Sequence, residues 1–332
     1  MIVLTFNVRG LRGRQKKNKI KELIRDHKVD FVPIQETKME VITTRLCQSL
    51  WGSDDCDWAF LPSEGNRGEI LSILRKSMAI VNYTFLGEGF VGVSLEWGVL
   101  RQRCVIINVY AKCDTESKRR LWERLTLARH NIGEGWWCIL GDFNAVGDVD
   151  QRRGVNDNAS PNQMVDMNLY RSFLTDVELE DHHLLGKRFT WYHANGRAMS
   201  RIDRVLISED WHHFWGENTL WVLPRDVSDH CLLVLEVGGW DWGPRSFRFN
   251  NYWLENRKVK DVVEGSWNSN NMRGWMGFVL KEKLKALKVK LTEWNKEEYG
   301  KVDMRISRLM EEIEDLDVEG EVTPLNEEAV RT

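Results

Sequence analysis

An aspartate and an asparagine stand two residues apart at the end of an apolar run. The segment ILGDFN predicts a buried strand that ends at Gly141 and then presents a carboxylate, Asp142, and a carboxamide, Asn144. Side chains two apart on an extended chain share a face, so these two groups would project together. Such a pair could act as a base and a positioning group for a water nucleophile. Asp and Asn are also common turn residues after a strand, and this segment alone does not decide between the two interpretations.

Two more oxygen-bearing side chains follow apolar runs near the N-terminus. Asn7 lies near the end of the run 2–8, and Glu36 comes just after the run 31–34. Carboxylate and amide oxygens are ligands of the type that a hard cation such as Mg²⁺ takes. A turn residue at Asn7 and a helix-entry carboxylate at Glu36 are the structural alternatives.

An aspartate inside one strand candidate and an Asp-His pair before another complete the set. SRIDRVLIS places Asp203 beside an apolar run, and VSDHC places Asp229 and His230 directly before the run 231–237. A carboxylate embedded in a strand is costly unless it has a partner. A histidine is a natural partner, because the carboxylate fixes the imidazole tautomer and favours its charged form.

The elements that would position these residues are short apolar runs bounded by polar or glycine-containing segments. Several runs are apolar on both faces, as expected for central strands that are covered on each side. Helical periodicity appears between some of them. The pattern predicts an α+β fold, namely a four-layer sandwich of two packed mixed β-sheets flanked by helices, followed by a helical C-terminal extension. The strand candidates are 2–8, 31–34, 70–74, 78–83, 91–96, 104–110, 137–140, 201–207 and 231–237.

The pattern of apolar runs changes near Gly238, which indicates that residues 1–240 form one domain. Residues 241–274 are aromatic and turn-rich and are expected to be a linker. Apolar residues then recur at spacings of four and three, first from 280 to 294 and again after Gly300. Residues 275–318 are therefore expected to form a helical hairpin or a longer coil, through which the chain could associate with itself. Residues 319–332 lack a period and are expected to be a disordered tail.

Charge and cysteine content restrict the class of protein. The net charge of -3 argues against a global positive field that would hold the chain on nucleic acid. A local rim of basic residues that binds nucleic acid is still possible. The candidates are Arg9, Arg12, Arg14, Lys16, Lys17, Arg152 and Arg153. For the first five of these, a solvated entry to a helix is the alternative. The six cysteines show no C-x-x-C pair, which argues against zinc and favours buried thiols in a reducing compartment.

The N-terminus has neither a basic region nor a long apolar region of the kind that a secretory signal carries. No apolar stretch reaches the length of about 18 residues that a transmembrane helix requires. We therefore expect an intracellular protein without a membrane partner, and neither the nucleus nor the cytosol is favoured.

Four short motifs together resemble the endonuclease/exonuclease/phosphatase superfamily. They are QET, GDFN, SRIDR and SDH, and they occur in the order that this superfamily shows. Longer stretches, among them FNVRGL, FLPSEGNRGEIL and LGKRFTWYHANGRAMSRIDRVL, are similar to the endonuclease domain of plant LINE-type non-LTR retrotransposons. The resemblance covers residues 1 to about 240. The segment after it looks like the region that joins this domain to the reverse transcriptase, and no reverse transcriptase is expected in this chain.

The resemblance implies a metal site in which Glu36 binds the ion, with Asn7 and Asp229 nearby. The ion would be Mg²⁺, and Mn²⁺ would be a substitute for it. DNA is the substrate that the resemblance implies. The expected activity is metal-assisted attack of water on a phosphodiester, which nicks DNA and leaves a 3′-hydroxyl.

The resemblance also implies the roles of the remaining groups. Asp142 would orient or deprotonate the attacking water, and Asn144 would hold the water or the phosphate. His230, paired with Asp203, would donate a hydrogen bond to a phosphate oxygen. Tyr110 matches the position of a phosphate-contacting aromatic residue, and a core aromatic at the end of a strand is its alternative.

Two differences from the related elements leave other functions open. Gly68-Glu69 stands where they usually have a glycine pair, and Lys112 replaces a turn proline after Tyr110 and Ala111. Either difference could lower stability, so a catalytically silent retrotransposon remnant is one alternative. A phosphatase or an RNA nuclease of the same superfamily is the other, because specificity lies in the surrounding loops.

Overall fold

The computed structural model describes residues 1–62, 70–133, 135–154, 161–194, 196–238, 253–254, 256–269 and 274–323. The chain divides into two compact units, one of residues 1–239 with 314–332 and the other of residues 240–313. All the site residues predicted from the sequence lie in the first unit. The Gly68-Glu69 difference and residues 241–252 of the expected linker lie outside the described residues.

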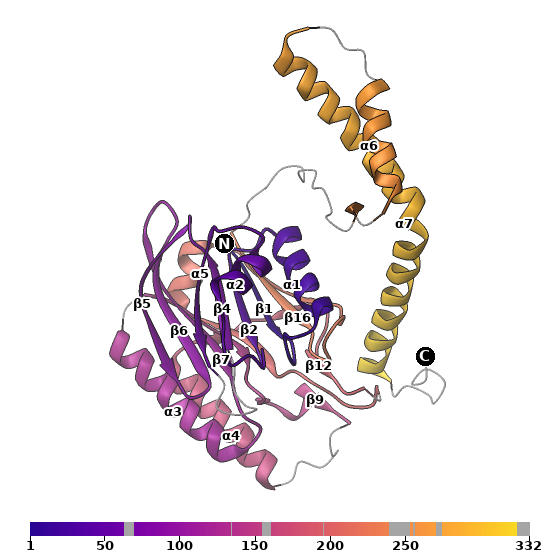
Figure 1. Cartoon of the computed structure of the whole chain (residues 1–332). Helices are drawn as coiled ribbons and strands as arrows, with labels where there is room; N and C mark the ends of the chain where they lie inside the picture. The colour runs from indigo at the N-terminus through magenta and orange to yellow at the C-terminus, as the bar shows by residue number, and fades with distance from the viewer. Residues whose placement is uncertain are drawn as a thin grey trace. The chain divides into compact units, whose positions relative to one another are not determined.

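Two mixed β-sheets form the centre of the first unit (Figure 1). The strands are β1 (Ile2–Asn7), β2 (Phe31–Gln35), β3 (Cys56–Leu61), β4 (Ile70–Arg75), β5 (Ala79–Gly87), β6 (Phe90–Trp97), β7 (Gln102–Tyr110), β8 (Trp136–Asp142), β9 (Arg152–Arg153), β10 (Glu180–Asp181), β11 (Leu184–Leu185), β12 (Trp191–Tyr192), β13 (Met199–Ser200), β14 (Asp203–Ile207), β15 (Asn218–Leu223) and β16 (Leu232–Val237). The seven-stranded sheet has the order β11-β15-β16-β1-β2-β4-β3, and the six-stranded sheet has the order β10-β14-β8-β7-β6-β5. Strands β12, β13 and β9 form a third, small sheet.

Helices cover the outer face of each large sheet. The helices of the first unit are α1 (Arg14–Asp26), α2 (Thr44–Trp51), α3 (Thr115–Ile132), α4 (Pro161–Val177) and α5 (Glu209–Trp215), with a 3-10 turn at Val149–Gln151. Ile20 of α1 and Leu50 of α2 pack with Leu4 of β1 on one side. On the other side, Leu121 of α3 and Phe173 of α4 pack in one cluster with residues of β7 and β8. The four-layer α+β sandwich predicted from the sequence is therefore confirmed.

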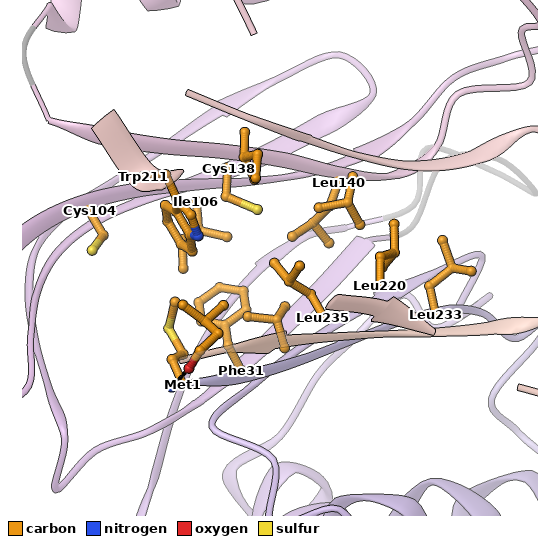
Figure 2. Packing of buried hydrophobic residues seen from close by; sticks show 14 of the residues in the cluster. Met1, Phe31, Cys104, Ile106, Cys138, Leu140, Trp211, Leu220, Leu233 and Leu235 are labelled. Atoms are coloured by element: carbon orange, nitrogen blue, oxygen red, sulfur yellow. Dashed lines mark hydrogen bonds between the residues drawn. The ribbon is translucent and has the colours of Figure 1, made fainter. Parts of the chain in front are cut away.

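The core between the sheets is built from residues that alternate with the outward-facing ones. Phe31 and Leu235 from the first sheet meet Ile106 and Leu140 from the second (Figure 2). The strands that carry them are covered on both faces, which is why their sequences are continuous apolar runs. Full burial of each such side chain stabilises the fold by about 1.5–3 kcal/mol. This core fixes the positions at which the strands end.

Side-chain caps define where two of the outer helices begin. Thr43 Oγ1 accepts a hydrogen bond from the backbone N–H of Leu46 at 3.2 Å, at the start of α2. Asp114 Oδ1 accepts one from the backbone N–H of Ser117 at 2.8 Å, at the start of α3. Such caps satisfy backbone donors that have no partner within the helix. The cap at Asp114 also fixes the chain directly after the loop that follows β7.

The second unit contains a helical pair, formed by α6 (Lys258–Ser269) and most of α7 (Met276–Val322). Trp253 and Val259 pack against Leu291 and Trp294 of α7. The helix α6 falls in the range that the sequence indicated as an aromatic, turn-rich linker. Valines have a low intrinsic helix propensity, and burial of Val259 against α7 overrides it.

Of the two arrangements expected for residues 275–318, a hairpin and a longer coil, the structure agrees with the longer one, because α7 continues through Gly300 without a break. One glycine inside a helix costs only about 1 kcal/mol, which a long helix tolerates. The helix also includes residues 319–322, where the sequence indicated a disordered tail. Residues 324–332 lie outside the described residues.

None of the helices in the described part of the chain combines the length and the hydrophobicity that a membrane span requires. Five of the six cysteines are buried and only Cys113 is exposed. Burial raises the pKa of the Cys104 thiol to about 12, so this thiol stays protonated and packs as an apolar group.

Candidate active site

The strand register brings the predicted site residues together at one end of the two sheets. Strands β1 and β2 are parallel, and Asn7 at the end of β1 pairs with Gln35, the residue before Glu36. Strands β7 and β8 are also parallel, and Tyr110 pairs with Asp142 at their ends. Parallel strands end at the same edge of a sheet, so polar residues at these ends must converge.

The neighbouring strand β14 adds the next residue to this row. It runs antiparallel to β8 and pairs Asp203 with Asp142. His230 stands just before β16, and an isolated bridge joins it to Trp191. The antiparallel neighbours thus contribute the starts of their strands to the edge at which β1 and β8 end.

The backbone is left-handed at two of the site residues. Glu36 has φ 50° and Asn144 has φ 46°, a conformation that side chains other than glycine rarely adopt. Gly141, with φ 132°, precedes Asp142, and a Cβ there would lie 2.2 Å from the carbonyl oxygen of Val109. These turns redirect the chain at the strand ends, and strain of this kind tends to cluster at functional sites.

Asn7 joins the two sheets by donating to two carboxylates. Its Nδ2 donates to Glu36 Oε1 at 3.0 Å and to Asp142 Oδ2 at 2.8 Å. Its Oδ1 accepts from the backbone N–H of Arg9 at 3.1 Å, which fixes the orientation of the amide. Asn7 is completely buried. The Asn7 amide therefore holds Glu36 and Asp142 close to each other.

Asp142 is buried, and its carboxylate accepts three hydrogen bonds, two from side-chain amides and one from a backbone N–H. Besides Asn7, its partners are the backbone N–H of Asn144 at 2.9 Å and Asn144 Nδ2 at 3.2 Å. Burial, followed by the nearby Asp203 carboxylate, raises the pKa of Asp142 to about 7, although His230 and these hydrogen bonds oppose the shift. A carboxylate with such a pKa can exchange a proton near neutral pH.

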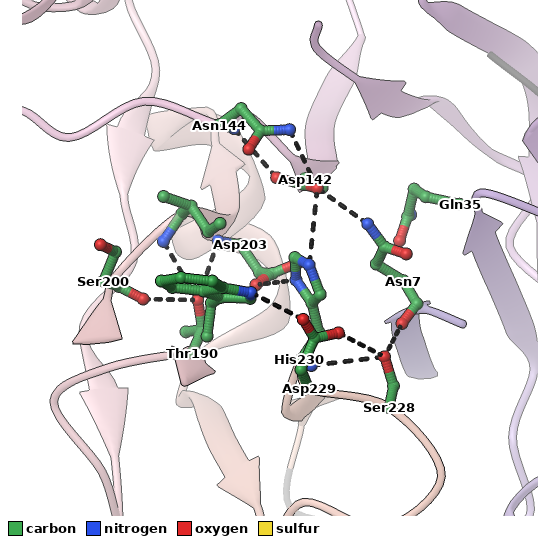
Figure 3. Close-up of polar contacts among 12 residues, drawn as sticks. Asn7, Gln35, Asp142, Asn144, Thr190, Ser200, Asp203, Ser228, Asp229 and His230 are labelled. Atoms are coloured by element: carbon green, nitrogen blue, oxygen red, sulfur yellow. Dashed lines mark hydrogen bonds and ion pairs between the residues drawn. The ribbon is translucent and has the colours of Figure 1, made fainter. Parts of the chain in front are cut away.

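His230 and Asp203 form a buried pair next to Asp142 (Figure 3). His230 Nδ1 lies 2.9 Å from Asp203 Oδ2, and Nε2 lies 4.0 Å from Asp142 Oδ2. Burial opposes the charged imidazole, but the Asp203 carboxylate outweighs burial and raises the pKa of His230 to about 9. The imidazole is therefore a cation at neutral pH and carries an N–H at Nε2 toward the site.

Tyr110 lies at the edge of the same cluster. Burial is the main reason that its pKa rises above the ordinary value, and the carboxylates of Glu36 and Asp142 add to the shift. The half-buried ring packs against the core between the sheets, so Tyr110 contributes to both the core and the polar cluster.

Asp229 faces a different set of partners. Its carboxylate forms an ion pair with Arg9 and accepts a hydrogen bond from Trp191 Nε1 at 2.9 Å. It does not belong to the compact group of potential ligand atoms, which comes from Glu36, Asp142 and His230 and lies within 4.8 Å. Sequence reasoning placed Asp229 near Glu36 as a metal residue, and that role stays a prediction; the structure shows an ion pair of Asp229 with Arg9.

The loop that follows Tyr110 is fixed without the turn proline of the related elements. The backbone N–H of Ala111 donates to Asp142 O at 2.8 Å, and Ala111 O accepts from Asn144 Nδ2 at 2.8 Å. Lys112 pairs with Glu88 at 2.7 Å. These contacts hold the loop against the site without a proline at position 112.

Several residues that support the site were missed in the sequence. Gln35 Nε2 donates to Asn108 Oδ1 at 2.6 Å, a buried polar link between the sheets. Thr190 Oγ1 accepts from the backbone N–H of Asp203 at 2.9 Å, and Ser228 Oγ donates to Asn7 O at 2.8 Å. Asn108 could have been found, because it interrupts the apolar run of β7. Thr190 stands among aromatic residues and Ser228 in a polar segment, and neither position gives such a signal.

The donor set fits a hard divalent cation. Two carboxylates, Glu36 and Asp142, share one amide donor; Lys38 lies 3.6 Å from Glu36, and His230 Nε2 lies 4.0 Å from Asp142. Two negative groups held this closely in a buried place are stabilised by a positive charge between them. Oxygen ligands are those that Mg²⁺ and Mn²⁺ prefer, whereas the charged His230 is a poor ligand.

A profile of the Endonuclease/Exonuclease/phosphatase family matches residues 4–230. The chain belongs to this family. The matched range spans β1 to His230 and thus every predicted site residue. Family members are hydrolases that include nucleases and phosphatases, and they generally use divalent metals.

Solved structures with the same fold include proteins of both activities. The 3′ phosphatase NExo from Neisseria, bound to a product DNA hairpin, is 18% identical, with a TM-score of 0.56 over 73% of this chain and 100% of that one. The AP endonuclease LMAP from Leishmania major is 16% identical, with a TM-score of 0.53 over 70% of this chain and 86% of that one. The endonuclease domain of TRAS1, a telomere-specific non-LTR retrotransposon, is 15% identical, with a TM-score of 0.54 over 71% of this chain and 97% of that one. At these identities the similarity concerns the fold. No match was found among curated proteins.

Proposed function

We propose that the protein is a Mg²⁺-dependent phosphodiesterase that nicks DNA, as a retrotransposon endonuclease does. The observation that supports this most directly is the double hydrogen bond of the Asn7 amide to Glu36 and Asp142, opposite the charged His230. It combines a carboxylate for a cation, a carboxylate of raised pKa and a cationic hydrogen-bond donor. These are the groups that hydrolysis of a phosphodiester needs.

Glu36 would hold the cation, and Asn7 would keep the Glu36 carboxylate in place. Mg²⁺ would polarise a phosphate oxygen when bound, and Mn²⁺ could replace it because it takes the same ligands. In this proposal Asp229 does not bind the ion directly. It would hold Arg9 at the rim of the site instead.

Asp142 and Asn144 would position the attacking water. Asp142 would accept a proton from this water, since burial raises its pKa to about 7. His230 would donate from Nε2 to a phosphate oxygen and stabilise the charge that develops there. The bond between phosphorus and the 3′ oxygen would break, and the 3′ oxygen would take a proton from solvent, which leaves a 3′-hydroxyl and a 5′-phosphate.

Basic side chains at the rim favour a polyanionic substrate. Arg9, half exposed, and the exposed Lys38 flank Glu36, and Lys16 Nζ donates to Val8 O beside them. Their charge is local, in agreement with the net charge of -3 of the whole chain. Contacts of this kind bind the phosphate backbone without reading its sequence.

A substrate panel tests the proposed function. We expect Mg²⁺-dependent nicking of supercoiled plasmid and loss of nicking in Glu36→Ala, with weaker turnover of abasic DNA, RNA and inositol phosphates. Turnover of RNA or inositol phosphates without nicking of DNA would show that the site has another activity found in the family. A folded wild type that hydrolyses none of them would assign the chain to a catalytically silent copy.

A further inference from the structure

The last part of α7 carries acidic residues that lie on the first unit. Asp317 and Glu321, four residues apart on α7, are both buried there. They contact the segment 187–192, which leads into β12. Residues from Glu314 onward belong to the same compact unit as this segment.

Asp317 is held by two cations. Arg225 donates to it from Nε at 2.9 Å and from Nη2 at 2.6 Å, and Lys187 Nζ donates at 3.1 Å. Lys187 also pairs with Glu314 and is almost completely buried. Bidentate, charge-assisted bonds of this type are short, strong and geometrically specific.

Glu321 binds the backbone of the same segment. Its carboxylate accepts from the backbone N–H of Arg188 at 3.2 Å and of Phe189 at 3.4 Å. The Tyr192 hydroxyl donates to it at 2.5 Å. One carboxylate thus satisfies three donors on a short loop, and those of the buried Phe189 and Tyr192 would be costly to leave unpaired.

The residues between these contacts hold the active site. Thr190 Oγ1 accepts from the backbone N–H of Asp203 at 2.9 Å, and Trp191 Nε1 donates to Asp229 at 2.9 Å. Thr190 O also accepts from the backbone N–H of Cys231 at 2.6 Å. The segment 187–192 therefore touches the partner of His230 on one side and the residues that flank His230 on the other.

We infer that Glu321, assisted by Asp317, is a positioning residue that holds segment 187–192 so that Thr190 and Trp191 keep the Asp203–His230 pair in register. This inference rests on the proposed nicking activity for its kinetic part. The acidic end of α7 is then part of the catalytic scaffold, although the family profile ends at residue 230. The link is indirect, because Glu321 contacts neither Asp203 nor His230 in the described structure.

The test compares Glu321→Gln with Glu319→Gln in the full chain. Both variants remove one negative charge from the same helix, and Glu319 is exposed. Glutamine keeps the size of the side chain but accepts less strongly from Arg188, Phe189 and Tyr192. Amide hydrogen exchange of residues 186–193, plasmid nicking and the melting temperature are measured for each protein.

We expect amide exchange in 186–193 to be about tenfold faster in Glu321→Gln, with Glu319→Gln unchanged. The kcat for nicking should fall about tenfold, because the charged His230 is misplaced. The KM should stay within about twofold, because the basic residues at the rim of the site still bind the DNA backbone. In the pH profile of nicking, the alkaline limb of Glu321→Gln should lie at a lower pH than that of the wild type. A general loss of stability would not produce this combination of changes in exchange, kcat and pH profile in the molecules that remain folded.

Unchanged exchange and unchanged kcat in Glu321→Gln would overturn the inference, and so would equal effects in Glu319→Gln. A faster reaction or a lower KM would also overturn it, because the acidic helix would then compete with the substrate. If the wild type does not nick DNA, the proposed function fails, and the exchange data alone decide whether Glu321 holds the segment.

Discussion

The imidazole Nδ1 of His230 lies 2.9 Å from Asp203 Oδ2, and both side chains are buried. This contact leaves Nε2 as the only ring nitrogen that faces Asp142. It also explains why the pKa of His230 rises to about 9 although burial opposes the charged ring. A histidine that would otherwise titrate below pH 7 is thereby kept as a cation.

Replacing Asp203 with asparagine should reduce catalysis strongly. Asp203→Asn removes the charge that raises the pKa of His230, so the ring loses its proton near neutral pH and no longer donates from Nε2. We expect single-turnover nicking to fall about 100-fold at pH 7.5, in the range that positioned proton donors contribute. A rate within threefold of the wild type, in a variant shown to be folded by circular dichroism, would contradict the assigned role.

The pH dependence of nicking should be bell-shaped. Asp142 has to be ionised and its pKa is about 7, while His230 has to be protonated and its pKa is about 9. The rate should therefore rise toward pH 7 and fall above pH 9. A bound cation favours the Asp142 carboxylate, so the acid limb is expected at or below 7 in Mg²⁺. An alkaline limb that is unchanged in Asp203→Asn would count against His230 as its source.

Without metal, the protein should become less stable as pH rises. The pKa of Asp142 in the folded protein is raised from 3.8 to about 7, so the folded state binds more protons between these values and loses stability as pH rises through them. The raised pKa of His230 contributes stability below 6.5 that is lost as pH rises through about 9.

Mg²⁺ should counter this loss. The expected result is a melting temperature that Mg²⁺ raises more at pH 8 than at pH 5, because the ion binds ionised carboxylates in the folded state. Melting curves in EDTA and in Mg²⁺ at both pH values measure it, with Glu36→Ala as the control. An equal shift at both pH values, or the same shift in Glu36→Ala, would argue against this site as the ion's location.

Much of the candidate site could be predicted because its residues stand at the ends or at the starts of apolar runs. Asn7, Asp142 and Asp203 were found in this way, and the register of the sheets then brings them together. What the sequence could not show is the direction of each side chain. Asp229 seemed equivalent to Glu36 by position, yet Arg9 and Trp191 hold it outside the compact cluster. Such contacts depend on loops far apart in sequence.

The C-terminal part shows a different limit. The apolar seams around Leu291 and Ile306 predict helices, but a single glycine gives little information on whether the chain turns at Gly300. The helix continues, and its end is held by Asp317, in the range expected to be helical, and by Glu321, in the stretch expected to be disordered. Charged residues of this kind become ordered only through partners elsewhere, here Lys187 and Arg225.

At Glu36, the residue that the backbone conformation favours differs from the residue that metal binding requires. Its backbone has φ 50°, which glycine adopts without strain and alanine does not. Both Glu36→Gly and Glu36→Ala should abolish Mg²⁺-dependent nicking, and Glu36→Gly should be more stable than Glu36→Ala by about 1 kcal/mol. Urea unfolding in EDTA measures the difference. Equal stability of the two variants would show that the left-handed backbone is not strained.

The measurement that tests the central claim most directly is relaxation of supercoiled plasmid by wild type and by His230→Ala, with the ends of the nick identified by primer extension. The account predicts Mg²⁺-dependent nicks with extendable 3′-hydroxyls in the wild type and at least about 100-fold slower nicking in a folded His230→Ala. Equal nicking by the two proteins, or no nicking by a folded wild type in Mg²⁺ or Mn²⁺, would contradict it.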